Sequence, residues 1–310
     1  MEYSYVLEGQ NIIKKYKNFT LDIEDLKIPK GFATALIGEN GAGKTTLLDI
    51  LAGIKLDYKG SLKFFGKYND KDREKIADIK NSIGYLGTGS YFFPQWTLSQ
   101  IEELQGLLFD NFNLDKYRQI CSDLALYQGG FFEKNKKVKD LSDGNRVKLM
   151  LAGILARDTD FLLLDEPASP LDPLMRDKLC NILRDYLSEN DGERSVLFST
   201  HNISDVESIT DYVIIVEQGR IVEQGFVEDL KEKYVIIKGE KKDETYAAKV
   251  IKNMSTSTFG FEGICLSEDL DKLSGMDIAV ERPTLSQISV HVMKEYSMLG
   301  GVNNNKREAS

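Results

Sequence analysis

The nine residues GENGAGKTT, at positions 38–46, have types and a spacing suited to binding phosphate. They satisfy G-x-x-x-x-G-K-[ST] between an apolar run and an amphipathic stretch, which predicts a strand before them and a helix after them. Gly41 and Gly43 would let backbone N–H groups turn inward around an anion at the positive end of that helix. Lys44 would neutralise β- and γ-phosphate charge, and the Thr45 hydroxyl would hold Mg²⁺. The other residues of this predicted nucleotide-binding loop are Gly38, Glu39, Asn40, Ala42 and Thr46.

Two acids follow a second apolar run, FLLLDEP, at residues 161–167. Asp165 would hold the Mg²⁺ shell, and Glu166 could polarise a water for attack on the γ-phosphate. The competing interpretation is a salt-bridged acidic pair at a strand end. His201 ends a third run, SVLFSTH, although a lone histidine is more often a packed polar side chain. At this point a GTPase or an enzyme of the adenylate-kinase type stays open.

The segment LSDGN, at residues 141–145, precedes a helix with a continuous apolar stripe. The stripe consists of Val147, Met150, Leu151, Ile154 and Leu155. Ser142 and the first backbone N–H groups could donate to a phosphate. A carboxylate at Asp143 facing that phosphate at ~4 Å would repel it by roughly 4 kcal/mol at an effective dielectric near 20. Turned away, the same acid would stabilise its own helix by about 0.3–1 kcal/mol.

The elements that must position these residues alternate between strand-like and helical runs, which indicates an α/β fold. Strands are predicted at GFATALIG, IGYL, FLLLD, SVLFST and YVIIVEQG. Helices are predicted after the phosphate loop, through much of residues 98–127, at 172–190 and at SDVESI (204–209). Thr97 with Gln100 forms a capping box that would open the second of these.

The composition limits the kinds of partner, metal site and membrane segment that the chain can have. The 310 residues carry 40 Lys and Arg against 49 Asp and Glu, a net charge of −9, which argues against general nucleic-acid binding. Three cysteines, Cys121, Cys180 and Cys265, have no metal-type spacing and fit a reducing compartment. The longest apolar runs are shorter than the ~20 residues of a membrane span.

Taken in order, GENGAGKTT, LSDGN, FLLLDEP, ASPLD and FSTHN resemble the motifs of the ATP-binding-cassette (ABC) ATPases, over residues 2–225. The resemblance implies an α/β P-loop fold with a RecA-like parallel-sheet core, an N-terminal antiparallel β subdomain and a helical signature subdomain. We place the cassette at residues 1–225, with the helical subdomain at about 88–157. A small C-terminal α+β unit would follow at 226–300, and a disordered tail at 301–310.

The resemblance also implies the roles of individual residues. Asp165 would end Walker B, Glu166 would be the catalytic carboxylate, and His201 would sense the γ-phosphate. Tyr16 would stack on adenine, and Asp172 would belong to the D-loop. The signature residues would be Ser142, Asp143, Gly144 and Asn145, acting on ATP held by the second subunit of a head-to-tail dimer. Because the third signature position varies in the family, we expect Asp143 to turn away from the phosphate.

One position departs from the family pattern. Where the family places a glutamine that meets Mg²⁺ and the membrane partner, this chain has Thr88. Thr88 is therefore the candidate magnesium ligand there. Gln95 lies seven residues too late to be its equivalent.

The resemblance implies the motor subunit of an ABC transporter, held at the cytoplasmic face of the membrane by a separate permease. The ending ERPTLSQISV resembles the tails of bacterial exporter cassettes for drugs, peptides or lantibiotics, so we expect export. The alternatives are a soluble ABC ATPase acting in DNA repair or translation, and a non-hydrolysing cassette, which Glu166 disfavours. The permease is expected to dock near the aromatic residues Tyr91, Phe92, Phe93 and Trp96, unless some of these fill the core.

Overall fold

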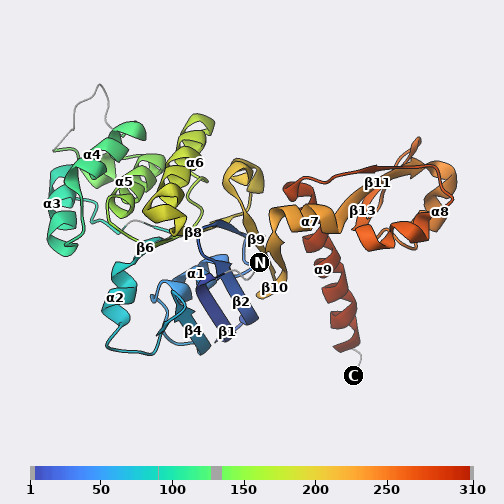
Figure 1. The fold of residues 1–310 in the computed structure, drawn as a ribbon, viewed down its shortest axis with the longest axis horizontal. Helices are drawn as coiled ribbons and strands as arrows, with labels where there is room; N and C mark the ends of the chain where they lie inside the picture. The colour runs from blue at the N-terminus through green and yellow to red at the C-terminus, as the bar shows by residue number, and fades with distance from the viewer. Residues whose placement is uncertain (1–3, 90, 127–134, 308–310) are drawn as a thin grey trace.

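The computed structural model describes residues 4–89, 91–126 and 135–307, with side chains as far as residue 297 (Figure 1). Its described part holds three β-sheets with helices packed around them. The arrangement matches the predicted α/β class, with a largely parallel central sheet, an antiparallel sheet from the N-terminal residues and a helical layer.

The central sheet contains six strands in the order β10-β9-β3-β8-β7-β6. Their bounds are β3 Ala33–Ile37, β6 Ile83–Leu86, β7 Phe161–Leu164, β8 Ser195–Thr200, β9 Tyr212–Glu217 and β10 Arg220–Phe226. Neighbouring strands are parallel, apart from the antiparallel pair of β9 and β10. β3, β7 and β8 are buried along their whole length, as parallel strands covered on both faces must be. The five strands predicted from apolar runs, β3 and β6 to β9, are confirmed.

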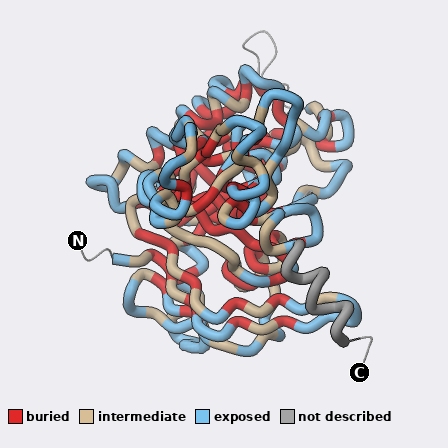
Figure 2. Tube along the Cα trace, turned by 90° about the vertical axis from the view of Figure 1, so that its right-hand side faces the viewer, coloured by how far each residue is buried: buried red, intermediate tan, exposed pale blue. Residues whose placement is uncertain are grey.

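The two faces of this sheet belong to two hydrophobic clusters. In β7, Phe161 and Leu163 point into one cluster, while Leu162 and Leu164 point into the other, because successive side chains of a strand alternate. Helix α1 (Lys44–Leu51) and the antiparallel sheet cover the first face, and α5 (Asp143–Leu155) and α6 (Pro173–Ser188) cover the second. Buried segments accordingly run through the middle of the molecule (Figure 2).

The antiparallel sheet has the order β2-β1-β4-β5. Its strands are β1 Tyr5–Lys15, β2 Thr20–Pro29, β4 Lys59–Phe64 and β5 Tyr68–Asn69, and α2 (Ile76–Asn81) follows them. In β2, buried positions recur at every second residue through much of the strand. The sheet therefore presents its apolar face to α1 and leaves the other face polar.

The helical layer consists of α3 (Leu98–Leu108), α4 (Leu114–Asp123) and α5. The predicted capping box is confirmed, since the Thr97 hydroxyl accepts from the Gln100 N–H while the Gln100 side chain accepts from the Thr97 N–H. The stripe predicted on α5 is buried at Met150, Leu151, Ile154 and Leu155. The helix predicted at 204–209 is instead two 3-10 turns, Ile203–Asp205 and Glu207–Ile209, because Val206 between them has a non-helical backbone, with φ −136° and ψ 8°.

The C-terminal part is built on a third sheet of order β12-β13-β11-β14. Its elements are α7 Val227–Lys233, β11 Tyr234–Glu240, α8 Glu244–Ala247, β12 Ser255–Thr256, β13 Gly260–Leu266, β14 Ile278–Glu281 and α9 Leu285–Arg307. Further 3-10 turns lie at Val138–Asp140, Asn190–Gly192, Lys241–Asp243 and Ser267–Leu273. On α9, Leu285, Ile288 and Val292 join the hydrophobic cluster of the central sheet, so this helix packs on the cassette.

The structure describes helix α9 as far as Arg307. The expected disorder of the tail at 301–310 stays a prediction. The run from Leu285 to Arg307 contains no proline, so the helical hydrogen-bond ladder can continue. Residues 308–310 lie outside the described part, and the domain limits at 225 and 300 stay predictions.

Candidate active site

The phosphate loop joins β3 to α1. Gly41 and Gly43 have φ of +90° and +109°, in the left-handed region that favours glycine. Gly43 stands at the N-cap of α1, and no side chain caps this helix. Its first N–H groups are therefore left for a ligand. The Lys44 ammonium is buried at the centre of the loop and donates to the carbonyl oxygens of Gly38 at 2.7 Å and Glu39 at 3.2 Å.

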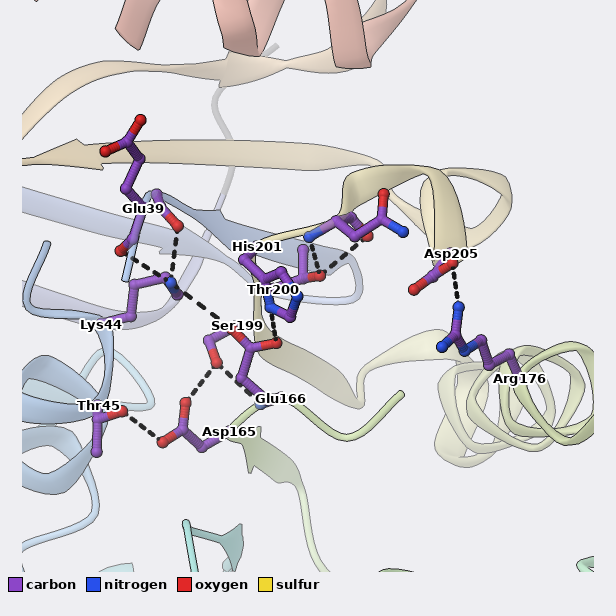
Figure 3. Close-up of polar contacts among 12 residues, drawn as sticks. Glu39, Lys44, Thr45, Asp165, Glu166, Arg176, Ser199, Thr200, His201 and Asp205 are labelled. Carbon is purple, nitrogen blue, oxygen red and sulfur yellow. Dashed lines mark hydrogen bonds and ion pairs between the residues drawn. The ribbon is translucent and has the colours of Figure 1, made fainter. Parts of the chain in front are cut away.

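The acidic pair follows β7 directly, beside the end of β8 (Figure 3). Asp165 accepts a hydrogen bond from the Thr45 hydroxyl at 2.7 Å. It accepts a second from the Ser199 hydroxyl, which itself accepts from the Glu166 N–H at 2.9 Å. Thr45 and Asp165 offer hard oxygen ligands on neighbouring elements, and Mg²⁺ is often held by one or two such groups together with substrate phosphates. These two residues therefore fit a magnesium ion.

The Glu166 carboxylate lies between a lysine and a histidine (Figure 3). One oxygen is 3.6 Å from Lys44 Nζ, and the other is 2.7 Å from His201 Nδ1. Glu166 has φ +50°, which is uncommon outside glycine and marks a backbone held by its surroundings. A carboxylate so placed beside the phosphate loop can accept a proton from a water that attacks phosphorus.

A cavity of about 450 Å³ brings these groups together, within the size range of small-ligand sites. The predicted residues that line it are Glu39, Asn40, Gly41, Gly43, Lys44, Thr45, Thr46, Thr88, Glu166 and His201. Two further lining residues, Phe19 and Ser169, were not predicted from the sequence. Thr88 therefore lies where a glutamine was expected, at the wall of the cavity.

The predicted adenine-stacking residue lies just outside this lining. Tyr16 is 41% exposed, and its ring centre is 6.2 Å from that of Phe19. Phe19 packs directly on the loop, because a Cβ added at Gly43 would lie 2.8 Å from its ring. The aromatic spacing in YKNF was the signal for Phe19, three residues after Tyr16. Stacking by Tyr16 stays a prediction.

One buried acid near the loop was also missed. Glu217 ends β9 and is buried, and its pKa is raised by burial and by the charge of Glu39, against a lowering by Lys44. Among the described residues, its Oε2 has no hydrogen-bond partner. Glu217 therefore interacts with the charges of Glu39 and Lys44 in the phosphate loop, but it does not line the cavity.

The signature segment is not part of that cavity. Ser142 caps α5 by accepting from the Asn145 N–H at 3.3 Å. The Asp143 side chain is 86% exposed and pairs with Arg146 at 2.9 Å. Gly144 lies against the D-loop, where an added Cβ would be 2.8 Å from the Pro170 carbonyl oxygen. In the D-loop, Asp172 caps α6 by accepting from the Met175 N–H at 3.0 Å.

The aromatic loop after β6 divides into two pairs. Tyr91 and Phe93 are 50% and 65% exposed. Phe92 and Trp96 are partly buried against the core, and the Trp96 ring meets Phe93 edge-on at 4.9 Å. Tyr91 and Phe93 are thus candidates for docking a partner, and Phe92 and Trp96 are candidates for filling the core. No helix in the described part of the chain is long and apolar enough to cross a membrane.

Comparison with known proteins gives the wider context. The model of the ABC transporter family matches residues 21–169. The energy-coupling factor transporter ATP-binding protein EcfA2 of Methanospirillum hungatei is 33% identical over 220 residues, covering 69% of this chain and 53% of that protein. The match thus spans about half the length of EcfA2. The ABC transporter ATP-binding protein YxlF of Bacillus subtilis is 30% identical over 228 residues, covering 73% of each chain.

Two further matches agree. The bacitracin transport ATP-binding protein BcrA of Enterococcus faecalis is 26% identical, covering 80% of this chain and 79% of that protein. Among solved structures, an ATP-binding cassette determined as a dimer in a post-hydrolysis state with ADP and Pi has a TM-score of 0.59 at 21% identity. It covers 71% of this chain and 98% of its own, and confirms the fold. By sequence and by fold, this chain belongs to the ATP-binding proteins of the ABC transporter family, which are ATPases.

Proposed function

We propose that this chain is the Mg²⁺-dependent motor subunit of an ABC exporter, dimerising around two ATP molecules and driving a separate permease. The observation that carries the proposal is the position of Glu166, between Lys44 and His201 at the wall of the phosphate cavity. A carboxylate there can take the proton of an attacking water while Lys44 holds phosphate charge.

Each residue of the cavity then has a defined task. Lys44 and the N–H groups of the loop bind the β- and γ-phosphates. Thr45 and Asp165 hold Mg²⁺, which neutralises charge that develops on the phosphates. Glu166 takes the proton, and His201 orients the Glu166 carboxylate through the 2.7 Å contact. The Ser199 hydroxyl fixes Asp165 and the Glu166 backbone relative to each other.

Dimerisation is supported because, in the described part of the chain, no signature residue lines the cavity. The residues that line it come from the loop, Thr88, the acidic pair and His201, and none comes from the signature 142–145. A second subunit could supply Ser142 and the free N–H groups of α5 across the interface. Asp143 would stay outside this contact, because its carboxylate is exposed and paired with Arg146.

Coupling to a permease is supported by the names of the relatives, which favour transport over DNA repair or translation. Tyr91 and Phe93 offer exposed aromatic surface to such a partner at the cytoplasmic face of the membrane. Export is proposed from the ending ERPTLSQISV, which resembles the tails of exporter cassettes. The relatives' names support transport, since BcrA is named for bacitracin transport.

The test of hydrolysis is phosphate release by the purified protein with ATP and Mg²⁺. Lys44→Met should nearly abolish release, whereas Lys272→Met, which replaces a lysine 66% exposed, should leave it unchanged. Release that needs neither Mg²⁺ nor Lys44 would overturn the proposal.

The direction requires the permease. It can be identified by co-purification from membranes and placed with this chain in inverted vesicles. ATP-driven uptake of the cargo into these vesicles would support export, and ATP-driven loss would show import.

A further inference from the structure

Two loops lead away from the nucleotide cavity and come together again at Arg176. In the D-loop, residues 168–172, Ser169 lines the cavity and Asp172 caps α6. The second loop begins at the cavity with His201 and leads into the 3-10 turn that ends at Asp205. Figure 3 shows Arg176, on α6, with its guanidinium pointing toward Asp205. One side chain thus connects two loops that each have a residue at the wall of the site.

Arg176 forms one hydrogen bond to each of these loops. Its Nε donates to the Leu171 carbonyl oxygen at 2.8 Å, and its Nη1 donates to the Asp205 carboxylate at 2.6 Å. The side chains of Arg176 and Asp205 are only 28% and 17% exposed, so salt screens this charge pair less than it would screen an exposed pair. The guanidinium is planar and holds its donors in a fixed geometry. It therefore sets the distance between the two loops.

The turn that carries Asp205 has few other directional contacts. The Asp205 N–H donates to the Asn202 carbonyl oxygen at 3.3 Å, in a single 3-10 turn, whose hydrogen-bond geometry is poorer than that of an α-helix. Cys180 Sγ, a weak donor, lies 3.6 Å from the Asp205 carbonyl oxygen. Burial of Ile203 in the core keeps the turn on the protein, but apolar packing has no preferred direction. The strongest contact that orients the turn relative to the D-loop is therefore the one from Arg176.

Both loops also contact Glu166. On one side, the Ser169 N–H donates to the Glu166 carbonyl oxygen at 3.2 Å. On the other side, His201 Nδ1 lies 2.7 Å from the Glu166 carboxylate. The His201 side chain is 48% exposed, so its position depends on the backbone of its loop more than on packing. Arg176 thus closes a ring of contacts that begins and ends at Glu166 and passes through Ser169, Leu171, Arg176, Asp205 and His201.

We propose that Arg176 is a positioning residue for ATP hydrolysis, which fixes His201 against the Glu166 carboxylate by holding Asp205 and the Leu171 carbonyl group together. The inference rests on the proposed function, in which Glu166 takes the proton of the attacking water and His201 orients that carboxylate. Neither Arg176 nor Asp205 is among the described residues that line the cavity. ATP binding should therefore survive the loss of either side chain, while hydrolysis slows.

The test is Arg176→Met, which keeps an apolar stem in place and removes the donors. At saturating ATP and Mg²⁺, the kcat for phosphate release should fall by about 10–10²-fold, because small misplacements in an active site are costly. The Kd for a non-hydrolysable ATP analogue should be unchanged, which a general loss of structure would not allow. Arg176→Lys keeps the charge but not the planar pair of donors, so it should recover only part of the lost rate.

A matched control lies on the same helix. Arg184 is exposed and donates to the Asn181 side chain at 2.6 Å, so Arg184→Met should keep both kcat and the Kd of the wild type. Asp205→Asn, which keeps the size of the side chain and removes its charge, should lower kcat in the same way as Arg176→Met. The double variant should lose less than the product of the two single losses, because both changes break the same contact.

The outcomes separate this inference from the proposed function. Wild-type kcat in both Arg176→Met and Asp205→Asn would overturn the inference, and so would losses that multiply in the double variant or an analogue affinity that falls as far as kcat. If Arg176→Met does not fold, Asp205→Asn decides between these results. Hydrolysis by the wild type that needs Lys44 and Mg²⁺ would leave the proposed function standing in each case. A wild-type protein that hydrolyses no ATP would overturn the proposed function, and this inference with it.

Discussion

Replacing Ser199 by alanine should weaken both the fold and ATP hydrolysis, because one hydroxyl connects two residues of the site. Ser199 is fully buried at the end of β8. Its hydroxyl donates to Asp165 and accepts from the Glu166 N–H at 2.9 Å. Alanine would leave that N–H without its partner. It would also remove one of the two hydroxyl groups that donate hydrogen bonds to the Asp165 carboxylate.

The magnitude follows from these two contacts. A polar group left unsatisfied costs about 1–3 kcal/mol. At about 2–4 °C per kcal/mol for domains of 150–250 residues, the Tm of Ser199→Ala should fall by roughly 2–12 °C. The turnover number should fall more steeply, by about 10²-fold, since Glu166 loses the anchor of its backbone and small misplacements are costly in catalysis.

The chain offers a matched control on the neighbouring strand. Thr34 is equally buried on β3, but among the described residues its hydroxyl has no partner. Thr34→Val therefore removes a buried hydroxyl without breaking a hydrogen bond, and should leave the Tm unchanged or raise it. Thermal unfolding and steady-state ATPase assays compare the two variants. Equal losses in both variants, or an unaltered Tm and kcat in Ser199→Ala, would show that the Ser199 hydroxyl does not anchor the acidic pair.

The remaining predictions concern the signature, the aromatic loop and α9. Asp143→Gly should change the ATPase rate only modestly, because its carboxylate is exposed, whereas Gly144→Asp should nearly abolish it; equal, severe losses would show that the third position faces the phosphate. Phe93→Ala should remove stimulation by the permease while keeping basal activity and Tm, since this ring is 65% exposed. Trp96→Ala should also remove stimulation by the permease with basal activity largely kept, and the emission of this single tryptophan should shift to the blue when the permease binds; an unfolded variant would assign the ring to the core. Since burial lowers the pKa of His291, the unfolded chain binds more protons, so the free energy of unfolding should fall as the pH drops below about 6.5. His291→Gln should flatten this dependence in urea titrations at several pH values, and an unchanged slope would contradict the assignment.

Much of the fold could be predicted because the signals are local. The strands that carry the site are short apolar runs, and the phosphate loop, the capping box at Thr97 and the stripe on α5 each lie within a few turns of chain. Local patterns of this kind depend on neighbouring residues, so a single sequence contains them.

The contacts that were missed depend on register between distant segments. In FSTHN, Ser199 looks like any residue of a buried strand. Only the pairing of Leu164 with Phe198 brings it beside Asp165. Phe19 lies in the turn between β1 and β2, yet it lines the cavity beside the phosphate loop. The 3-10 turns at 203–209 contact α6 and α9, and α9 is distant in the sequence.

The role of Glu166 is tested by the rate of phosphate release by Glu166→Gln at saturating ATP and Mg²⁺, beside that of the wild type. Glutamine keeps the shape of the side chain and removes its basicity. We expect the variant to retain ATP in a stable dimer and to hydrolyse it about 10²–10⁴-fold more slowly, the usual contribution of a general base. Hydrolysis at the wild-type rate would show that Glu166 does not take the proton, and would contradict the mechanism proposed for this site.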